Sequence, residues 1–126
     1  MSDYRSELSD LFASGAFPED AFYIHKAFQN RRIITYGAGE SFHYFKEIVM
    51  RQYGYIPSVV LDRKFRPGDT FEGIPAYSPL EYQPSAEEKD QGLVVVCLGK
   101  QHYFDEVIQT LKGMGFNHII SLMDIY

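Results

Sequence analysis

Cysteine is almost absent from this chain, and long apolar runs are absent altogether. The single cysteine, Cys97, excludes a disulfide within the chain and a zinc site built from several cysteines. Cys97 lies inside the run VVVCL, so we interpret it as a buried and inert thiol. No apolar stretch approaches the roughly 20 residues that a membrane-spanning helix needs. We therefore expect no disulfide framework and no membrane span.

Basic residues are also scarce relative to acidic ones. The chain has 12 Lys and Arg against 17 Asp and Glu, which gives a formal net charge of -5. A duplex nucleic-acid binder needs a basic surface, so this class is excluded. The segment from Met1 to Asp10 is polar and contains acids, unlike a signal peptide. We expect a cytoplasmic protein.

The remaining composition is that of a globular domain. Of the 126 residues, 45% are hydrophobic and 23% are charged, and the length fits one domain. Aromatic residues reach 16%. They either fill an ordinary core or cover a partner surface, where Tyr and Phe are enriched. A homodimer is therefore one open alternative.

Segments with strand and helix patterns alternate along the chain. Residues 1–30 have helical spacing and are expected to form a helical extension. Within 31–126 we expect strands at 33–36, 58–61, 74–77, 93–98 and 119–122, helices at 40–53 and 104–111, a short helix from Ser78, and an exposed loop at 84–92. This alternation predicts an α/β fold, a Rossmann-like three-layer sandwich with a mostly parallel sheet of about five strands.

The segment IITYGAGESF is the most informative part of the sequence. It places Gly37, Ala38 and Gly39 between a strand and a helix, the context of a dinucleotide-binding loop. Gly37 suits the tight turn, Gly39 lets the backbone approach a phosphate or ribose, and the helix that opens at Glu40 and Ser41 offers free N–H groups. The alternative is a glycine turn that serves packing only.

Two residues depart from the usual pattern of such a loop. Phe42 occupies the position of the third glycine, which normally allows close packing of helix and strand. Glu40 stands where a pyrophosphate would lie, and its carboxylate would repel a second anion. A sugar hydroxyl, a ribose or an amine would suit Glu40 better.

Two further segments follow strands at the edge where α/β sheets bind ligands. Asp62 ends the second expected strand, where an acid meets ribose hydroxyls, or else it caps the next turn. Arg63 is a candidate for a ligand phosphate, with a solvated basic turn as the alternative. Gly99, Lys100 and His102 follow the strand at 93–98, and Lys100 could neutralise phosphate. The histidines show no metal-ligand spacing, and no catalytic constellation can be assembled.

The order YGAG, a strand ending in Asp62, EGIPAYSPLE, VVVCLG and LKGMGFNHII resembles a known group of domains. It is similar to the N-terminal Rossmann-like domain of FkbM-type methyltransferases. It also resembles the nucleotide-sugar-binding N-terminal domain of PglD-like sugar acyltransferases. The resemblance covers residues 31–122 and implies that Gly37, Gly39 and Asp62 face a ligand. It implies no catalytic residue in this chain.

The resemblance implies an accessory domain that binds a nucleotide or nucleotide sugar beside a companion catalytic domain. The chain ends directly after an expected strand, where a doubly wound domain normally continues. Nucleotide sugars, NAD(P) and S-adenosylmethionine are the candidate ligands. An NAD(P)-binding domain of an oxidoreductase and a non-catalytic structural or dimerisation domain are the alternatives.

Overall fold

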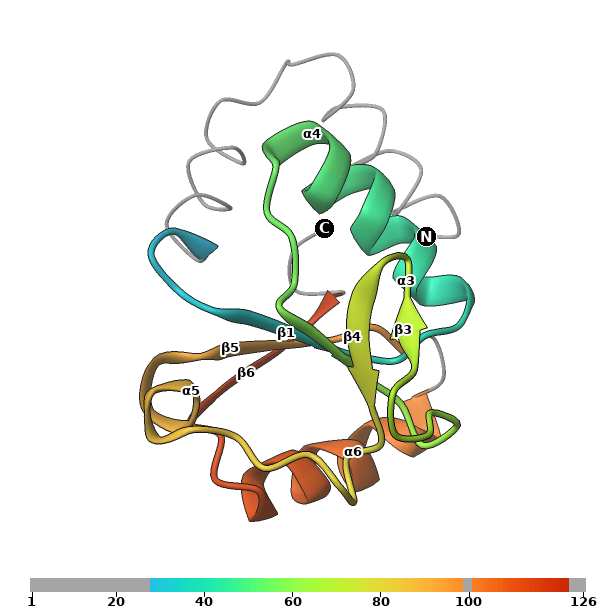
Figure 1. The fold of residues 1–126 in the computed structure, drawn as a ribbon. Helices are drawn as coiled ribbons and strands as arrows, with labels where there is room; N and C mark the ends of the chain where they lie inside the picture. Colours follow the sequence, from blue (N-terminus) through green and yellow to red (C-terminus); the bar gives the residue numbers. More distant parts are fainter. Residues whose placement is uncertain (1–27, 99–100, 123–126) are drawn as a thin grey trace.

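A computed structural model describes residues 28–98 and 101–122, without the side chains of 101–103 (Figure 1). The described part contains a six-stranded sheet in the order β3-β4-β2-β1-β5-β6. The strands are β1 (Ile33–Tyr36), β2 (Val59–Leu61), β3 (Thr70–Phe71), β4 (Ile74–Tyr77), β5 (Leu93–Val96) and β6 (His118–Ser121). All pairings are parallel except that of β3 with β4. The predicted α/β Rossmann-like fold is confirmed.

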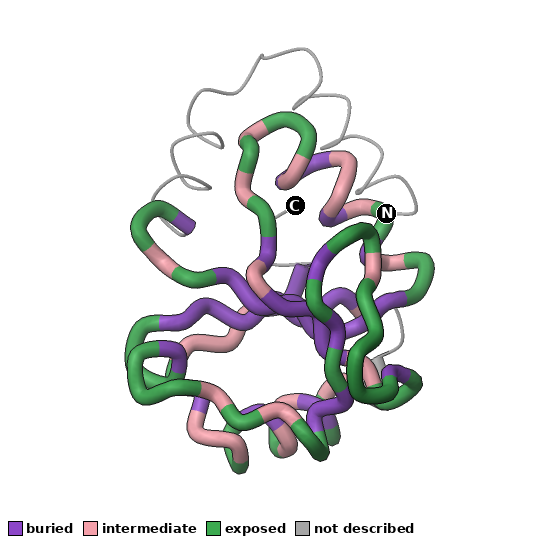
Figure 2. The backbone as a smooth tube through the Cα atoms, in the orientation of Figure 1, coloured by how far each residue is buried: buried purple, intermediate pink, exposed green. Residues whose placement is uncertain are grey.

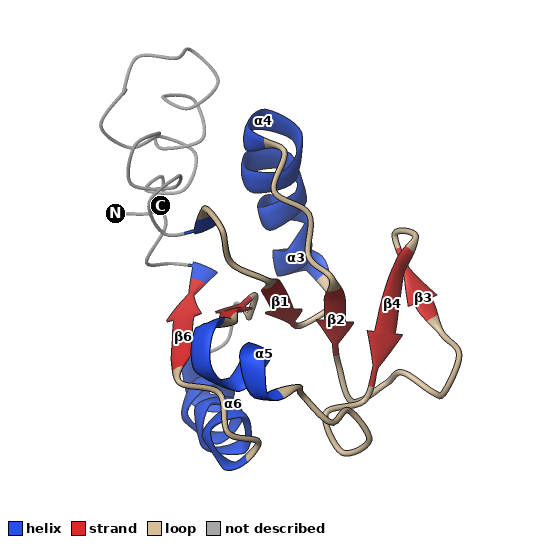
Figure 3. Cartoon of the chain, turned by 60° about the vertical axis from the view of Figure 1, so that its left-hand side comes forward, coloured by secondary structure: helices blue, strands red, loops and turns tan. Residues whose placement is uncertain are grey.

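The order of the strands reverses at β1, the third strand from the β6 edge of the sheet. The chain leaves β1 for β2 through one continuous helical stretch, which comprises α3 (Glu40–Phe45), η1 (Lys46–Met50) and α4 (Arg51–Tyr53). It leaves β5 for β6 through α6 (Gln101–Gly113), which covers the opposite face of the sheet (Figures 1 and 3). The carboxyl ends of β1 and β5 therefore border the switch point where open α/β sheets hold ligands.

Alternate side chains of the central strands β1, β2 and β5 enter two separate hydrophobic cores. On one face, Ile33, Val60 and Val95 pack with Phe45 and the rest of the helix at 40–53. On the other face, Ile34, Val94 and Val96 pack with Val107 and Leu111 of α6. Figure 2 shows the resulting band of buried backbone through the middle of the molecule. Because both faces of these three strands are covered, they read as continuous apolar runs, whereas β4 alternates between buried and exposed residues.

The helix at 40–53 was predicted, but its middle turn is wider than expected. Gly54 ends it in the left-handed conformation that glycine adopts readily, with φ of 76°. Residues 46–50 form a π-helical segment, which the apolar periodicity does not reveal. Such segments are rare and occur mostly as single turns inside α-helices.

Two sequence-based expectations were wrong. The expected loop at 84–92 contains helix α5 (Ala86–Gln91), which starts with a capping box between Ser85 and Glu88. The expected helix from Ser78 is a turn, in which Leu80 N–H donates to Ser78 Oγ at 3.2 Å. Ser78 caps this turn as it would a helix, but the apolar stripe that stabilises a longer helix is missing.

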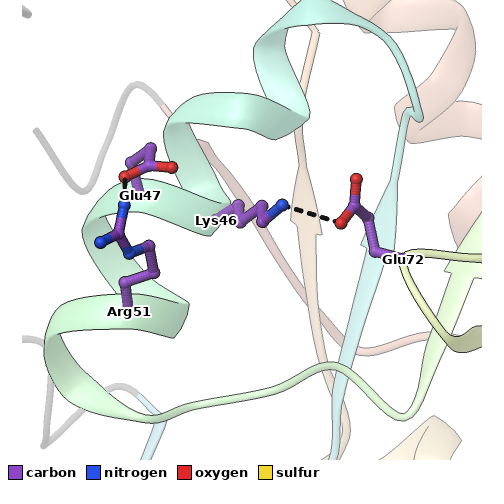
Figure 4. A network of polar contacts seen from close by, with 4 residues as sticks. All are labelled: Lys46, Glu47, Arg51 and Glu72. Carbon is purple, nitrogen blue, oxygen red and sulfur yellow. Dashed lines mark hydrogen bonds and ion pairs between the residues drawn. The ribbon is translucent and has the colours of Figure 1, made fainter.

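The β3–β4 hairpin contacts the helix at 40–53 through an ion pair and an aromatic pair. Lys46 Nζ lies 2.8 Å from Glu72 Oε2 at the tip of the hairpin, while Arg51 pairs with Glu47 along the helix (Figure 4). The Phe71 ring meets the Phe42 ring edge-on, with 5.0 Å between ring centroids. The hairpin thus extends the core on this face beyond β2.

Two remaining expectations concern the N-terminal region and the membrane. Most of the helical extension expected at 1–30 lies outside the described residues. Among the helices of the described part, none is long and apolar enough to cross a membrane.

Candidate functional site

The glycine turn begins directly after β1, against the backbone that follows β5. Gly37 has φ of +108°, and a Cβ added there would lie 2.4 Å from the backbone oxygen of Cys97. Its N–H donates to the Leu61 carbonyl at 2.8 Å. Only glycine fits this position, because a side chain would clash with backbone and the left-handed conformation is strained for other residues.

Asp62 joins the glycine turn to the end of β2. The Ala38 N–H donates to Asp62 Oδ2 at 2.9 Å, and the Lys64 N–H donates to Asp62 Oδ1 at 3.1 Å. Asp62 therefore caps its own turn and binds the glycine turn as well. Each carboxylate oxygen keeps a lone-pair site for a further donor.

Lys64 also contacts the glycine turn, and with Asp62 it forms a junction between this turn and the end of β2. Its ammonium Nζ donates to the Ala38 carbonyl at 2.9 Å. The same ammonium lies 5.7 Å from the Phe65 ring centroid and 5.6 Å from that of Phe71. Both polar backbone groups of Ala38 are thus bound by residues 62–64, and this holds the turn in one conformation without a ligand.

A pocket of about 260 Å³ opens beside this junction, between the sheet and α6. Its lining residues come in equal number from the two halves of the chain: Tyr36, Asp62, Arg63, Leu98, Glu106 and Val107. Leu98 and Val107 make apolar walls, and the other four supply polar groups. The pocket therefore combines an apolar surface with a few convergent polar groups, as small-molecule sites do.

The electrostatics of the pocket centre on Arg63. Its Nη2 lies 3.3 Å from Glu106 Oε1, with both side chains more than half exposed. An exposed pair of this kind contributes only about 0–1 kcal/mol, so other charged groups can compete with it. Burial raises the pKa of Tyr36, although the neighbouring Arg63 guanidinium acts in the opposite direction. The Tyr36 hydroxyl is therefore protonated at neutral pH.

The two residues that depart from the usual loop pattern do not line the pocket. Phe42 is buried in the core on the α3 face, opposite the pocket, where its ring contacts Phe45 and Phe71. Glu40 is exposed at the start of α3, and neither Glu40 nor Ser41 lines the pocket. Gly39 borders open space. The Phe42 ring consequently does not fill the pocket.

The other predicted site residues are placed as follows. Of these, Asp62 and Arg63 line the pocket, and Gly37 and Ala38 are buried next to it. Gly99, Lys100 and the side chain of His102 lie outside the described residues. No group of three or more His, Cys, Asp or Glu side chains that could hold a metal is found in the described ranges.

Sequence reasoning missed four of the lining residues. Tyr36 and Val107 were assigned to a strand and a helix without a role in the site, and Leu98 and Glu106 were not singled out. Strand alternation could have found Tyr36, because Ile34 and Tyr36 share the face that α6 covers. Glu106 is a polar residue next to the apolar Val107 on the same helix. Its place in the pocket lining depends on how the helix is oriented against the sheet, which the sequence does not show.

A comparison of the chain with protein-family models, curated proteins and solved structures finds no match.

Proposed function

We propose that this chain is an accessory domain that binds a nucleotide or nucleotide sugar for a companion catalytic domain. One observation carries the proposal: the hydrogen bond from Ala38 to Asp62 joins the glycine turn to the acid beside a pocket at the switch point. Ligands of open α/β sheets bind at this place. The glycine turn and the acid were also the two features expected to face a ligand.

The lining groups suit the parts of a nucleoside. Leu98 and Val107 offer an apolar surface against which a planar base can pack. Asp62 retains lone pairs for ribose hydroxyls, and the protonated Tyr36 hydroxyl can both donate and accept. The volume of about 260 Å³ lies just below the usual range of roughly 300–1,000 Å³ for ligand sites. It suits one nucleoside or sugar unit, with the rest of a larger ligand outside.

The role of the companion domain is to supply the chemistry. The six lining residues in the described part of the chain include no Ser, Cys or His. A pocket that binds and orients a ligand fits an accessory module. The resemblance to FkbM-type and PglD-like proteins supports the same assignment.

The test is a ligand panel measured on the full chain. Thermal shift and NMR titration with UDP-sugars, NAD, NADP and S-adenosylmethionine should give stabilisation and shifts centred on residues 36–38, 62–63 and 106–107. Leu98→Trp should abolish the response, because the larger ring occupies the pocket. Leu80→Trp is the matched control, since Leu80 is 83% exposed and does not line the pocket.

Each other outcome has a definite meaning. Stabilisation by NAD or NADP alone would favour the NAD(P)-binding domain of an oxidoreductase. No response to any ligand, together with a stable dimer in light scattering, would replace the proposal with a structural or dimerisation role.

A further inference from the structure

We propose that Glu106 is a specificity residue, which makes the pocket select an uncharged, hydroxyl-bearing ring over the same ring carrying a phosphate. The inference rests on the proposed function, because it concerns the ligand of the same pocket. It starts from the three charged side chains among the lining residues, which are Asp62, Arg63 and Glu106.

Arg63 taken alone would attract phosphate. It directly follows Asp62 and lines the same pocket, so its guanidinium can pair with a phosphate on a ribose hydroxyl that Asp62 binds. The Glu106 carboxylate on α6 forms an ion pair with this guanidinium, with 3.3 Å between Arg63 Nη2 and Glu106 Oε1. A phosphate would have to displace Glu106 and would then lie close to two carboxylates.

The sum of these charges favours a neutral ligand. Two carboxylates and one guanidinium give the six lining residues that the structure describes a formal charge of -1, and the Tyr36 hydroxyl adds a neutral polar group. Hydroxyls can still donate to Asp62, because its oxygens each retain a lone pair beside the backbone N–H groups of Ala38 and Lys64. A ribose with free hydroxyls therefore meets acceptors, whereas a ribose phosphate meets repulsion.

Glu106 can be changed without disturbing the fold. Its side chain is 61% exposed on α6, and the backbone carbonyl, not the carboxylate, accepts the Thr110 hydroxyl. Asp105 is the neighbouring residue on the same helix, is exposed and does not line the pocket. Asp105→Asn thus removes the same charge from the same helix turn and is the matched control for Glu106→Gln.

The experiment compares four probes on the full chain: adenosine, uridine and their 2′-monophosphates. For each variant, NMR titration gives the ratio of the Kd of the monophosphate to the Kd of the parent nucleoside. The wild type should bind the nucleosides more tightly than the monophosphates. Glu106→Gln should lower the ratio roughly threefold to tenfold, since it removes one charge within a few ångströms of the phosphate. Asp105→Asn should change it less than about twofold, because exposed charges farther away are screened.

Repeating the Glu106→Gln comparison in a protein that lacks the Arg63 guanidinium isolates the contribution of Arg63 to phosphate binding. In Arg63→Gln protein, Glu106→Gln should lower the ratio by less than in the wild type, because the guanidinium released by the substitution is no longer there. An equal ratio in Glu106→Gln and Asp105→Asn proteins would overturn the inference while leaving the proposed function intact. Failure of both nucleosides to bind the wild type would overturn the proposed function and the inference together.

Discussion

The Tyr82 hydroxyl donates a 2.7 Å hydrogen bond to the carboxylate of Glu88, which is 3% exposed. The other carboxylate oxygen accepts the Ser85 N–H at 2.9 Å, so both oxygens of a buried acid are satisfied. This junction holds the start of α5 against the turn that follows β4. Its charge makes the stability of the domain depend on pH.

The sign of this dependence follows from the pKa of Glu88. Burial raises the pKa, but the hydrogen bonds from Ser85 and Tyr82 outweigh it, so the pKa in the folded chain lies below its ordinary value. The stabilisation is therefore complete above the unfolded pKa and is lost as the pH falls through the folded pKa.

We expect Glu88→Gln to lower the free energy of unfolding by about 1–3 kcal/mol at neutral pH. The difference from the wild type should shrink in acid, where the wild-type carboxylate is protonated. Urea unfolding at a series of pH values measures both effects. Glu87→Gln, an exposed neighbour in the same helical turn, is the control. A constant difference at all pH values would contradict the assignment.

The glycine turn contains a matched pair of glycines. Gly37→Ala should destabilise the fold by at least about 1–3 kcal/mol, because it combines a left-handed φ with a Cβ at 2.4 Å from the Cys97 oxygen. Gly39→Ala should change stability by less than about 1 kcal/mol, since Gly39 has φ of -103° and borders open space. Denaturant unfolding of the two variants decides the matter, and equal costs would count against the described turn.

Restoring the third glycine of the usual fingerprint should be harmful here. Phe42→Gly removes a ring that is 2% exposed and touches two other rings, so we expect a loss of about 3–5 kcal/mol. His43→Gly, at the exposed next position of the same helix, is the control: it costs about 1 kcal/mol of helix propensity and removes only an exposed ring that meets Tyr44 edge-on. A similar loss in both variants would mean that the Phe42 ring adds no stability.

The single thiol reports on opening of the core. Cys97 is 1% exposed, and burial raises the pKa of its thiol. A thiol reagent such as DTNB at pH 8 should therefore react at least roughly 10³-fold more slowly with the native protein than with the urea-unfolded chain. Absorbance of the released thiolate follows the reaction. Rapid reaction with one equivalent in the native protein would show that the end of β5 is accessible.

Much of the central sheet was predictable because its physical signals are local. The runs at 33–36 and 93–96 are apolar without alternation, which is typical of strands covered on both faces. The helix at 40–53 has a clear apolar stripe and a terminal glycine. The missed helix α5 also carried a local signal, the Ser85–Glu88 capping pair, which was hidden within a polar segment.

Only two of the six lining residues were predicted, for a different reason. Asp62 and Arg63 follow a strand directly, and their position at the sheet edge comes from sequence order alone. Strand alternation places Tyr36 on the face that α6 covers, but Glu106 lies beside it only because of how α6 packs on the sheet. That relationship is set by tertiary packing across 70 positions of the chain, so no short segment contains it. The two-residue strand β3 was missed because it is too short for any periodicity.

The pocket walls come from both halves of the fold, so a bound molecule would affect how these halves open. Three lining residues precede residue 64 and three follow residue 97. They belong to the two halves of the fold that extend the sheet in opposite directions from β1. A molecule held between them would bridge both halves, so neither could open alone without releasing it. Amide hydrogen exchange in β2 and in α6 would then slow by the same factor, and the two halves would open as a single cooperative unit.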